Sequence, residues 1–94
     1  MHLEVKNIHP CASSELRDYI NDAIEEIFDR VSIDLRDFTC NVNFSHAGRR
    51  IKCHISIHSA NKTYVSEATN DNQSIAFQDA LEKIDHQIKK HNHN

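Results

Sequence analysis

Residues 38–58 read FTCNVNFSHAGRRIKCHISIH, and the alternation of apolar and polar side chains in this stretch predicts a β-hairpin. Apolar side chains occupy every second position on either side of a turn, at Phe38, Cys40, Val42, Phe44, Ile51, Cys53, Ile55 and Ile57. The turn lies at Ala47-Gly48, because glycine accepts the backbone conformations that tight hairpin turns need. Successive strand side chains point to opposite faces, so the hairpin has one buried face and one face rich in Asn, Ser and His.

The same alternation appears before and after the hairpin. Residues 1–8 place Met1, Leu3 and Val5 on one face of a predicted strand, which Pro10 ends. A turn at Asn61-Lys62 precedes another predicted strand, whose inward side chains are Tyr64, Ser66 and Ala68.

Two segments have helical rather than strand periodicity. Residues 14–31 follow a candidate N-cap, Ser13, and carry an apolar stripe of Leu16, Tyr19, Ile20, Ala23, Ile24, Ile27, Phe28 and Val31. A second helix follows a cap at Asp71 or Asn72. Its stripe consists of Ile75, Phe77, Ala80, Leu81, Ile84 and Ile88.

The element order is therefore β-α-β-β-β-α, an α+β fold with two helices on one face of a four-stranded sheet, as in double-stranded-RNA-binding domains. A right-handed crossover makes the first two strands parallel, and the last three strands form an antiparallel meander. With 94 residues, the chain is long enough for one domain, which we expect to span residues 1–91. We expect the tail at 92–94 to be frayed.

Composition limits the classes of function. The net charge is −3, so any RNA binding requires a local cationic patch. No apolar run is long enough to cross a bilayer and no signal segment is evident, so we expect a cytoplasmic protein without membrane contact. Three cysteines, an odd number, argue against a disulfide framework.

Catalysis and metal binding have little support in the residues. Cys40 and Cys53 fall on the inward face of the hairpin, where they could be diagonal neighbours. Buried cysteines behave as small hydrophobes. Cys11 is the one thiol expected to be reachable, and no oxyanion-type loop accompanies it. His54 and His58 share a strand without the spacing of a zinc site. We therefore expect no enzyme activity, cofactor, metal or small-molecule substrate.

Cationic side chains gather in two places. Arg49, Arg50 and Lys52 lie at the hairpin turn, and the last helix carries Lys83, His86, Lys89, Lys90 and His91. Two interpretations fit the helical group equally well. It forms an RNA-binding stripe, since such cations contact successive phosphates, or it is a solvated face whose cations complement the helix dipole.

The first helix has the opposite character. Its outward positions are mostly acidic, at Glu15, Asp18, Asp22, Glu25, Glu26 and Asp29. This face repels phosphate and is either a solvated surface or a surface that meets a basic protein.

Residues 63–91 resemble the C-terminal half of the hibernation-promoting factor and ribosome-associated inhibitor family, also known as sigma-54 modulation proteins. The family pattern is matched at residues 76–91, AFQDALEKIDHQIKKH. Residues 16–20, LRDYI, resemble that family's "LRDYV" motif. The resemblance covers nearly the whole chain, and it matches the short type, which has no additional dimerising domain.

The resemblance implies a partner and a set of contacts. The family binds the decoding region of the small ribosomal subunit, where it blocks the channel for mRNA and tRNA under stress. The resemblance implies RNA contacts by Arg17, Lys83, His86, Lys89, Lys90 and His91. We add Arg49, Arg50 and Lys52 of the hairpin to the predicted RNA contacts because of their charge and not because of the resemblance. Two alternatives remain, a paralogue that binds a protein partner and a module that binds double-stranded RNA.

Overall fold

The computed structural model describes residues 1–7, 14–30, 33–34 and 36–91 of the chain. The elements in chain order are β1 (His2–Lys6), α1 (Ser14–Arg30), β2 (Thr39–Ala47), β3 (Arg50–His58), β4 (Thr63–Asn70) and α2 (Gln73–His91). The predicted order and the α+β class are confirmed. The proposed N-cap, Ser13, and the last stripe residue of the first helix, Val31, lie outside the described residues.

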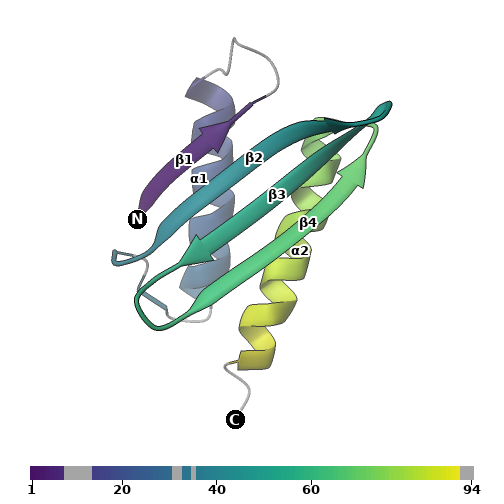
Figure 1. Cartoon of the computed structure of the whole chain (residues 1–94). Helices are drawn as coiled ribbons and strands as arrows, with labels where there is room; N and C mark the ends of the chain where they lie inside the picture. Colours follow the sequence, from purple (N-terminus) through teal and green to yellow (C-terminus); the bar gives the residue numbers. More distant parts are fainter. Residues whose placement is uncertain (8–13, 31–32, 35, 92–94) are drawn as a thin grey trace.

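The four strands form one sheet in the order β1-β2-β3-β4 (Figure 1). β1 is parallel to β2, with Leu3 opposite Cys40, whereas β2–β3 and β3–β4 are antiparallel. The predicted parallel crossover and meander are therefore correct. β1 and β4 are the two edges of this sheet, and each edge has a row of backbone groups without a neighbouring strand.

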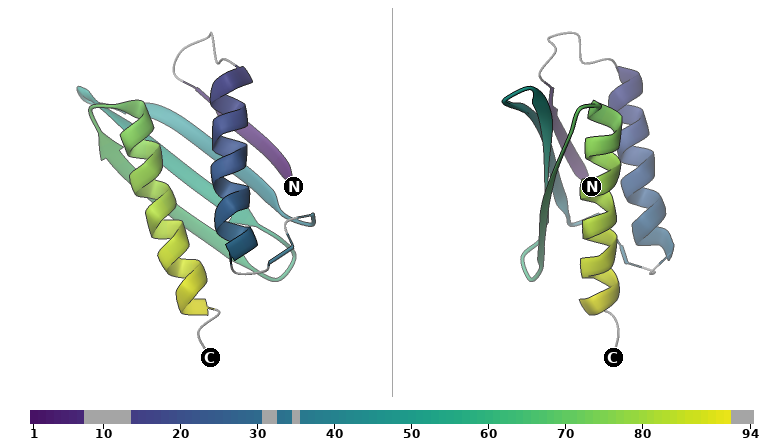
Figure 2. Two further views of the ribbon diagram at one scale, coloured as in Figure 1. Left: turned by 180° about the vertical axis from the view of Figure 1, so that it is seen from behind. Right: turned by 90° about the vertical axis from the view of Figure 1, so that its right-hand side faces the viewer.

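Both helices cover the same face of the sheet and begin at the same end of it (Figure 2). α1 lies over the half of the sheet that contains β1 and β2, and α2 packs on β3 and β4. The opposite face carries the polar strand positions and is uncovered by any described element, so the molecule has two layers.

The apolar faces predicted from alternation meet in one core. Phe28 of α1 lies between Phe38 and Tyr64, with ring centroids 5.7 and 6.1 Å away. Ser66 is a buried polar residue, and its Oγ donates a hydrogen bond of 2.7 Å to the carbonyl oxygen of Ala80. A buried donor without a partner destabilises the fold, and this bond gives the Ser66 hydroxyl its partner. It also joins β4 to α2.

The start of α2 confirms one of its two predicted caps. Asn72 Oδ1 accepts hydrogen bonds from the backbone N–H groups of Ser74 (2.8 Å) and Ile75 (3.2 Å). The side chain thereby satisfies two of the N–H groups that a helix leaves unpaired at its N-terminus.

Two side chains assigned to the apolar stripes are more exposed than predicted. Ile75 is 43% exposed, and Ala76 is buried in its place. Ala76 lies four residues before Ala80, whereas Ile75 is rotated by a further ~100° toward solvent. Tyr19 is also 43% exposed, because it lies at the margin of its stripe, where its ring meets Phe77 edge-on at 5.8 Å.

Candidate nucleic-acid interface

The β2–β3 hairpin holds three of the predicted RNA contacts. Gly48 has a φ of 66°, the left-handed conformation that suits glycine, and this sharp turn places Arg49 at the tip. Arg50 and Lys52 follow on the polar face of β3. Arg50 Nε is 3.5 Å from Asp71 Oδ1, and Lys52 Nζ is 3.9 Å from a carboxylate oxygen of Glu67. Arg49 has no ion pair within the described part of the chain.

Two of the predicted contacts on α2 lie near carboxylates of the same helix. Lys89 Nζ is 3.1 Å from Asp85 Oδ2, and His86 Nε2 is 4.0 Å from Glu82 Oε1. Lys90 is exposed and has no ion pair among the residues that are described. His91 ends the helix, and its side chain lies outside the described part. Lys83, His86, Lys89 and Lys90 are all exposed, but α2 is a mixed-charge helix rather than a purely basic one.

Lys83 has a structural contact that the sequence does not reveal. Its Nζ donates a hydrogen bond of 2.7 Å to the backbone carbonyl of Glu67, and Gln87 donates one of 2.6 Å to the carbonyl of Val65. Both carbonyls belong to the edge strand β4, two residues apart, so they point the same way. The two side chains therefore cover the open edge of the sheet.

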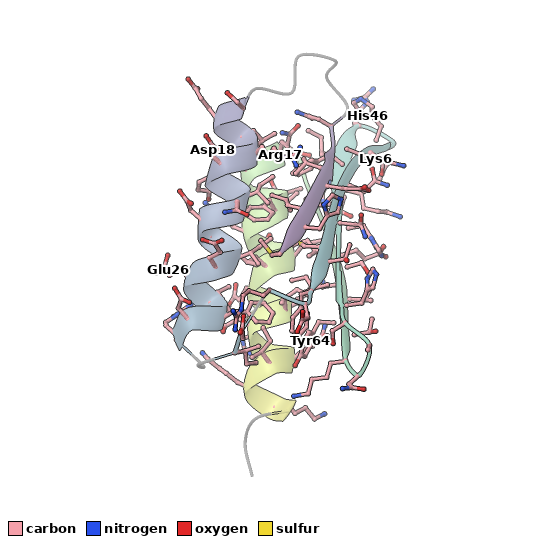
Figure 3. The ribbon with its side chains drawn as sticks, turned by 90° about the vertical axis from the view of Figure 1, so that its left-hand side faces the viewer. Lys6, Arg17, Asp18, Glu26, His46 and Tyr64 are labelled. Carbon is pink, nitrogen blue, oxygen red and sulfur yellow. The ribbon has the colours of Figure 1, made fainter. Side chains whose placement is uncertain are left out.

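Arg17 has the corresponding role at the other edge. Its guanidinium donates a hydrogen bond of 2.6 Å to the carbonyl of Leu3 in β1, and Figure 3 shows Arg17 between α1 and this strand. Because β1 and β4 are opposite edges, Arg17 lies apart from Lys83. The structure does not bring Arg17 together with the other predicted RNA contacts.

Glu67 connects the hairpin group to the helical group. Lys52 reaches its carboxylate from the polar face of the sheet, and Lys83 reaches its carbonyl from the side of the helices. Lys90 lies seven residues after Lys83, two turns further along the same side of α2. We call Arg49, Arg50, Lys52, Lys83 and Lys90 the cationic band. Its residues belong to the β2–β3 hairpin and to α2, and Lys52 and Lys83 meet at Glu67 on the β4 edge. Figure 1 shows these elements side by side.

Lys6 is a further exposed cation near the hairpin end of the cationic band, and it was not among the predicted RNA contacts. The parallel register places Lys6 beside Asn43, which in turn pairs with His54 on β3, and all three lie on the polar face. Figure 3 shows Lys6 at the hairpin end of the sheet, near His46. Its outward position was predictable from alternation, but its proximity to the hairpin required the strand order.

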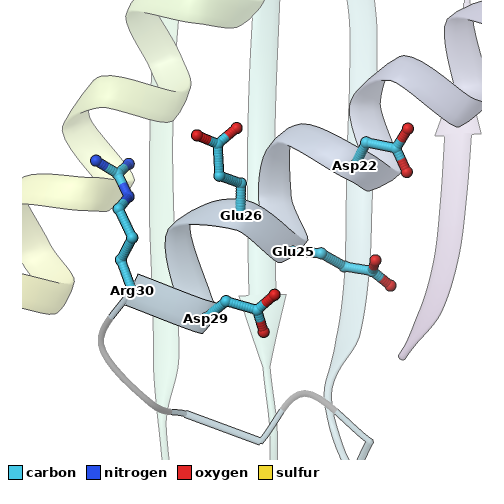
Figure 4. Close-up of a pocket in the computed structure, with 5 residues that line it drawn as sticks. All are labelled: Asp22, Glu25, Glu26, Asp29 and Arg30. Atoms are coloured by element: carbon cyan, nitrogen blue, oxygen red, sulfur yellow. The ribbon is translucent and has the colours of Figure 1, made fainter.

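The outward face of α1 is as acidic as the sequence suggests. Asp18 and Glu26 point away from the sheet (Figure 3). Figure 4 shows a shallow pocket on this helix lined by Asp22, Glu25, Glu26, Asp29 and Arg30. The molecule thus has an acidic surface on α1 and a cationic band across the β4 edge.

The two described cysteines, Cys40 and Cys53, are free thiols buried in the core. Burial raises the pKa of the Cys40 and Cys53 thiols to about 12, so both stay protonated and weakly nucleophilic. The two are not diagonal neighbours, because Cys40 pairs with Ile57 and Cys53 with Phe44, four residues away along the strand. Cys11 lies outside the described residues.

The described residues contain neither a metal-binding cluster nor a membrane-spanning helix. No group of three or more His, Cys, Asp or Glu side chains there could hold a metal ion. No helix in this part of the chain is long and apolar enough to span a membrane.

Solved structures of other proteins share this fold, among them the following two. The N-terminal domain of Protein Y from Thermus thermophilus matches with a TM-score of 0.73 and 16% identity, over 96% of this chain and 98% of that one. A ribosomal subunit interface protein from Coxiella burnetii matches with a TM-score of 0.68 and 13% identity, over the full length of both chains. No curated protein sequence matches the chain significantly.

The family assignment rests on the sequence itself. Residues 3–94 match the model of a family described as "Sigma 54 modulation protein / S30EA ribosomal protein", which covers almost the whole chain. Its members are ribosome-associated regulators and in general not enzymes. The chain belongs to the Sigma 54 modulation protein / S30EA ribosomal protein family.

Proposed function

We propose that this protein binds the small ribosomal subunit in the channel for mRNA and tRNA and holds ribosomes inactive under stress. Family membership supports a ribosomal partner, and one of the structural matches is itself named a ribosomal subunit interface protein. The action is occlusion, in which a folded domain fills the space that mRNA and tRNA need. It requires no cofactor, substrate or covalent step, and it takes place in the cytoplasm.

The cationic band is the observation that carries this proposal. The chain has a net charge of −3, yet the band concentrates five cations along one route. Arg49 and Lys90, at its two ends, are exposed. Lysine and arginine at such positions bind phosphates and release counterions from the RNA. In our proposal Lys89, His86 and His91 add contacts beside the band on α2, and Arg17 contributes chiefly by holding β1.

Co-sedimentation with purified small ribosomal subunits tests the proposal. We expect binding at low salt that weakens steeply as salt rises, because phosphate contacts are screened and counterion release becomes less favourable. Two variants, Arg49→Ala with Lys52→Ala and Lys89→Ala with Lys90→Ala, should each reduce binding and flatten its salt dependence. Absence of co-sedimentation at low salt contradicts the proposal.

A matched control removes the same charge elsewhere. Arg30→Ala with Lys62→Ala also deletes two exposed cations, one at the end of α1 and one in the β3–β4 turn. This variant should bind like the wild type in the same assay. Equal losses in all three variants would show a dependence on net charge rather than on the band.

The acidic face of α1 favours a second candidate function, binding to a basic protein. The exposed carboxylates of this face would repel RNA but would complement a lysine-rich surface. Affinity capture that returns one protein and no ribosomal RNA would support this alternative. Equal binding to free duplex RNA and to the subunit would instead indicate a double-stranded-RNA module.

A further inference from the structure

We infer that bound RNA crosses the β4 edge at Glu67 and that the carboxylate of this residue weakens the binding. The inference rests on the proposed function and goes further, since it assigns a path for the RNA backbone and a residue that acts against it. Glu67 lies at the middle of the cationic band, between the hairpin and α2.

The contacts of Glu67 place it on this path. Lys52 approaches its carboxylate at 3.9 Å from the polar face of the sheet, and Lys83 donates to its carbonyl at 2.7 Å from the helical side. Any RNA strand that contacts both lysines therefore passes over Glu67. Its side chain is 59% exposed, so its negative charge faces an approaching phosphate directly.

The carboxylate of Glu67 contributes little to the fold. It is on the polar face of an edge strand, and its ion pair with Lys52 is long and exposed, a kind of pair that adds little stability. The hydrogen bond from Lys83 of α2 goes to the backbone carbonyl of Glu67, which every residue type provides. The carboxylate can thus be removed while the contact between β4 and α2 remains.

Its effect on RNA is repulsive for two reasons. The carboxylate neutralises part of the charge that Lys52 offers to a phosphate, and it repels the phosphate itself. Asp71 has the same relation to Arg50 at the hairpin end, where the two are 3.5 Å apart. The band is therefore attenuated by carboxylates on β4 and directly after it, and Glu67 is the one that contacts both the hairpin group and the helical group.

The test compares Glu67→Gln with Glu25→Gln in binding to purified small ribosomal subunits at low salt. Both variants remove one exposed carboxylate with little change in shape, but Glu25 lies on the acidic face of α1. We expect Glu67→Gln to tighten binding by about threefold, the effect of one unit charge several ångströms from a phosphate in water. Glu25→Gln should bind like the wild type. Glu67→Thr, which suits an edge strand, should tighten binding similarly and provides a second variant if the first folds poorly.

The outcomes separate this inference from the proposed function. If the wild type binds and Glu67→Gln binds no more tightly than Glu25→Gln, the path over Glu67 is wrong while ribosome binding stands. If the wild type fails to bind at low salt, both are wrong. Tighter binding by the Glu67 variants alone supports the path.

Discussion

At the scale of single residues, burial determines the chemistry of the hairpin cysteines. Cys40 and Cys53 are both fully buried beneath the helices, where a thiolate would lose its hydration. Desolvation therefore raises the pKa of each thiol to about 12. Neither side chain can act as a nucleophile or a metal ligand in the folded protein without first being exposed.

This leads to a prediction about thiol reactivity. In a Cys11→Ser variant, we expect the folded protein to react negligibly with dithionitrobenzoate at about pH 8, a pH at which exposed cysteines are partly thiolate. Unfolding in denaturant should release both remaining thiols. The measurement is the absorbance of released thionitrobenzoate, and rapid reaction without denaturant would contradict the buried placement.

Lys83 and Arg17, two of the predicted RNA contacts, each have a hydrogen-bond acceptor within the protein. Each donates to a backbone carbonyl of an edge strand, at 2.7 and 2.6 Å. Charge-assisted hydrogen bonds of this kind are stronger than neutral ones. Lys83 therefore has two roles, contact with β4 and, in our proposal, contact with phosphate.

At the scale of elements, the two edge strands are protected by side chains from the helices. Arg17 covers a carbonyl of β1, and Lys83 and Gln87 cover two carbonyls of β4. Uncovered edge strands pair readily with strands of other molecules, and natural proteins commonly block them with charged side chains. These contacts oppose pairing between copies of this chain.

We predict that Lys83→Ala combined with Gln87→Ala promotes self-association through β4. Alanine keeps α2 stable but leaves the carbonyls of Val65 and Glu67 open. Sedimentation velocity over a range of concentrations should show more dimer than in the wild type. Adding Val65→Pro should reverse the effect, because proline removes an N–H that points to the open edge.

The matched control for this prediction is Lys90→Ala with Ser74→Ala. It also removes one lysine and one neutral polar side chain from exposed positions of α2, away from the β4 carbonyls. It should sediment like the wild type. If the Lys83 and Gln87 variant does the same, these side chains do not protect the edge.

At the scale of the whole molecule, charges of opposite sign lie on separate surfaces. α1 presents carboxylates outward, while the cationic band runs from the hairpin across the β4 edge to α2. A polyanionic partner therefore attracts one side of the molecule and is repelled by the other. The bound protein should have one preferred orientation.

This orientation can be tested with single reporter cysteines in the Cys11→Ser background. Ser45→Cys lies on the polar face opposite Lys52, and Asp22→Cys lies on the acidic face of α1. With small subunits bound, we expect protection of residue 45 from a maleimide and continued labelling of residue 22. The reverse pattern would indicate that the acidic face makes the contact.

The elements were predictable from the sequence because their signals are local. Alternation assigned the inward side chains of all four strands correctly, including Tyr64 and Ser66, and helical spacing identified most of both stripes. Helical spacing failed at Ile75 and Tyr19. Both lie at the margin of an apolar stripe, where the rotation from one residue to the next changes burial. The candidate site was less predictable, because Lys6, Glu67 and Gln87 acquire their significance through neighbours far away in the chain.

The sequence by itself determined which segments are strands and helices and which face of each is buried, since these follow from backbone periods of two and 3.6 residues. Only the tertiary structure decided which charges meet. The pairing of β3 with β4 and the packing of α2 beside that edge bring Lys52, Glu67 and Lys83 together. Electrostatic and hydrogen-bond contacts act over a few ångströms, and strand register and helix docking, rather than spacing along the chain, determine those distances.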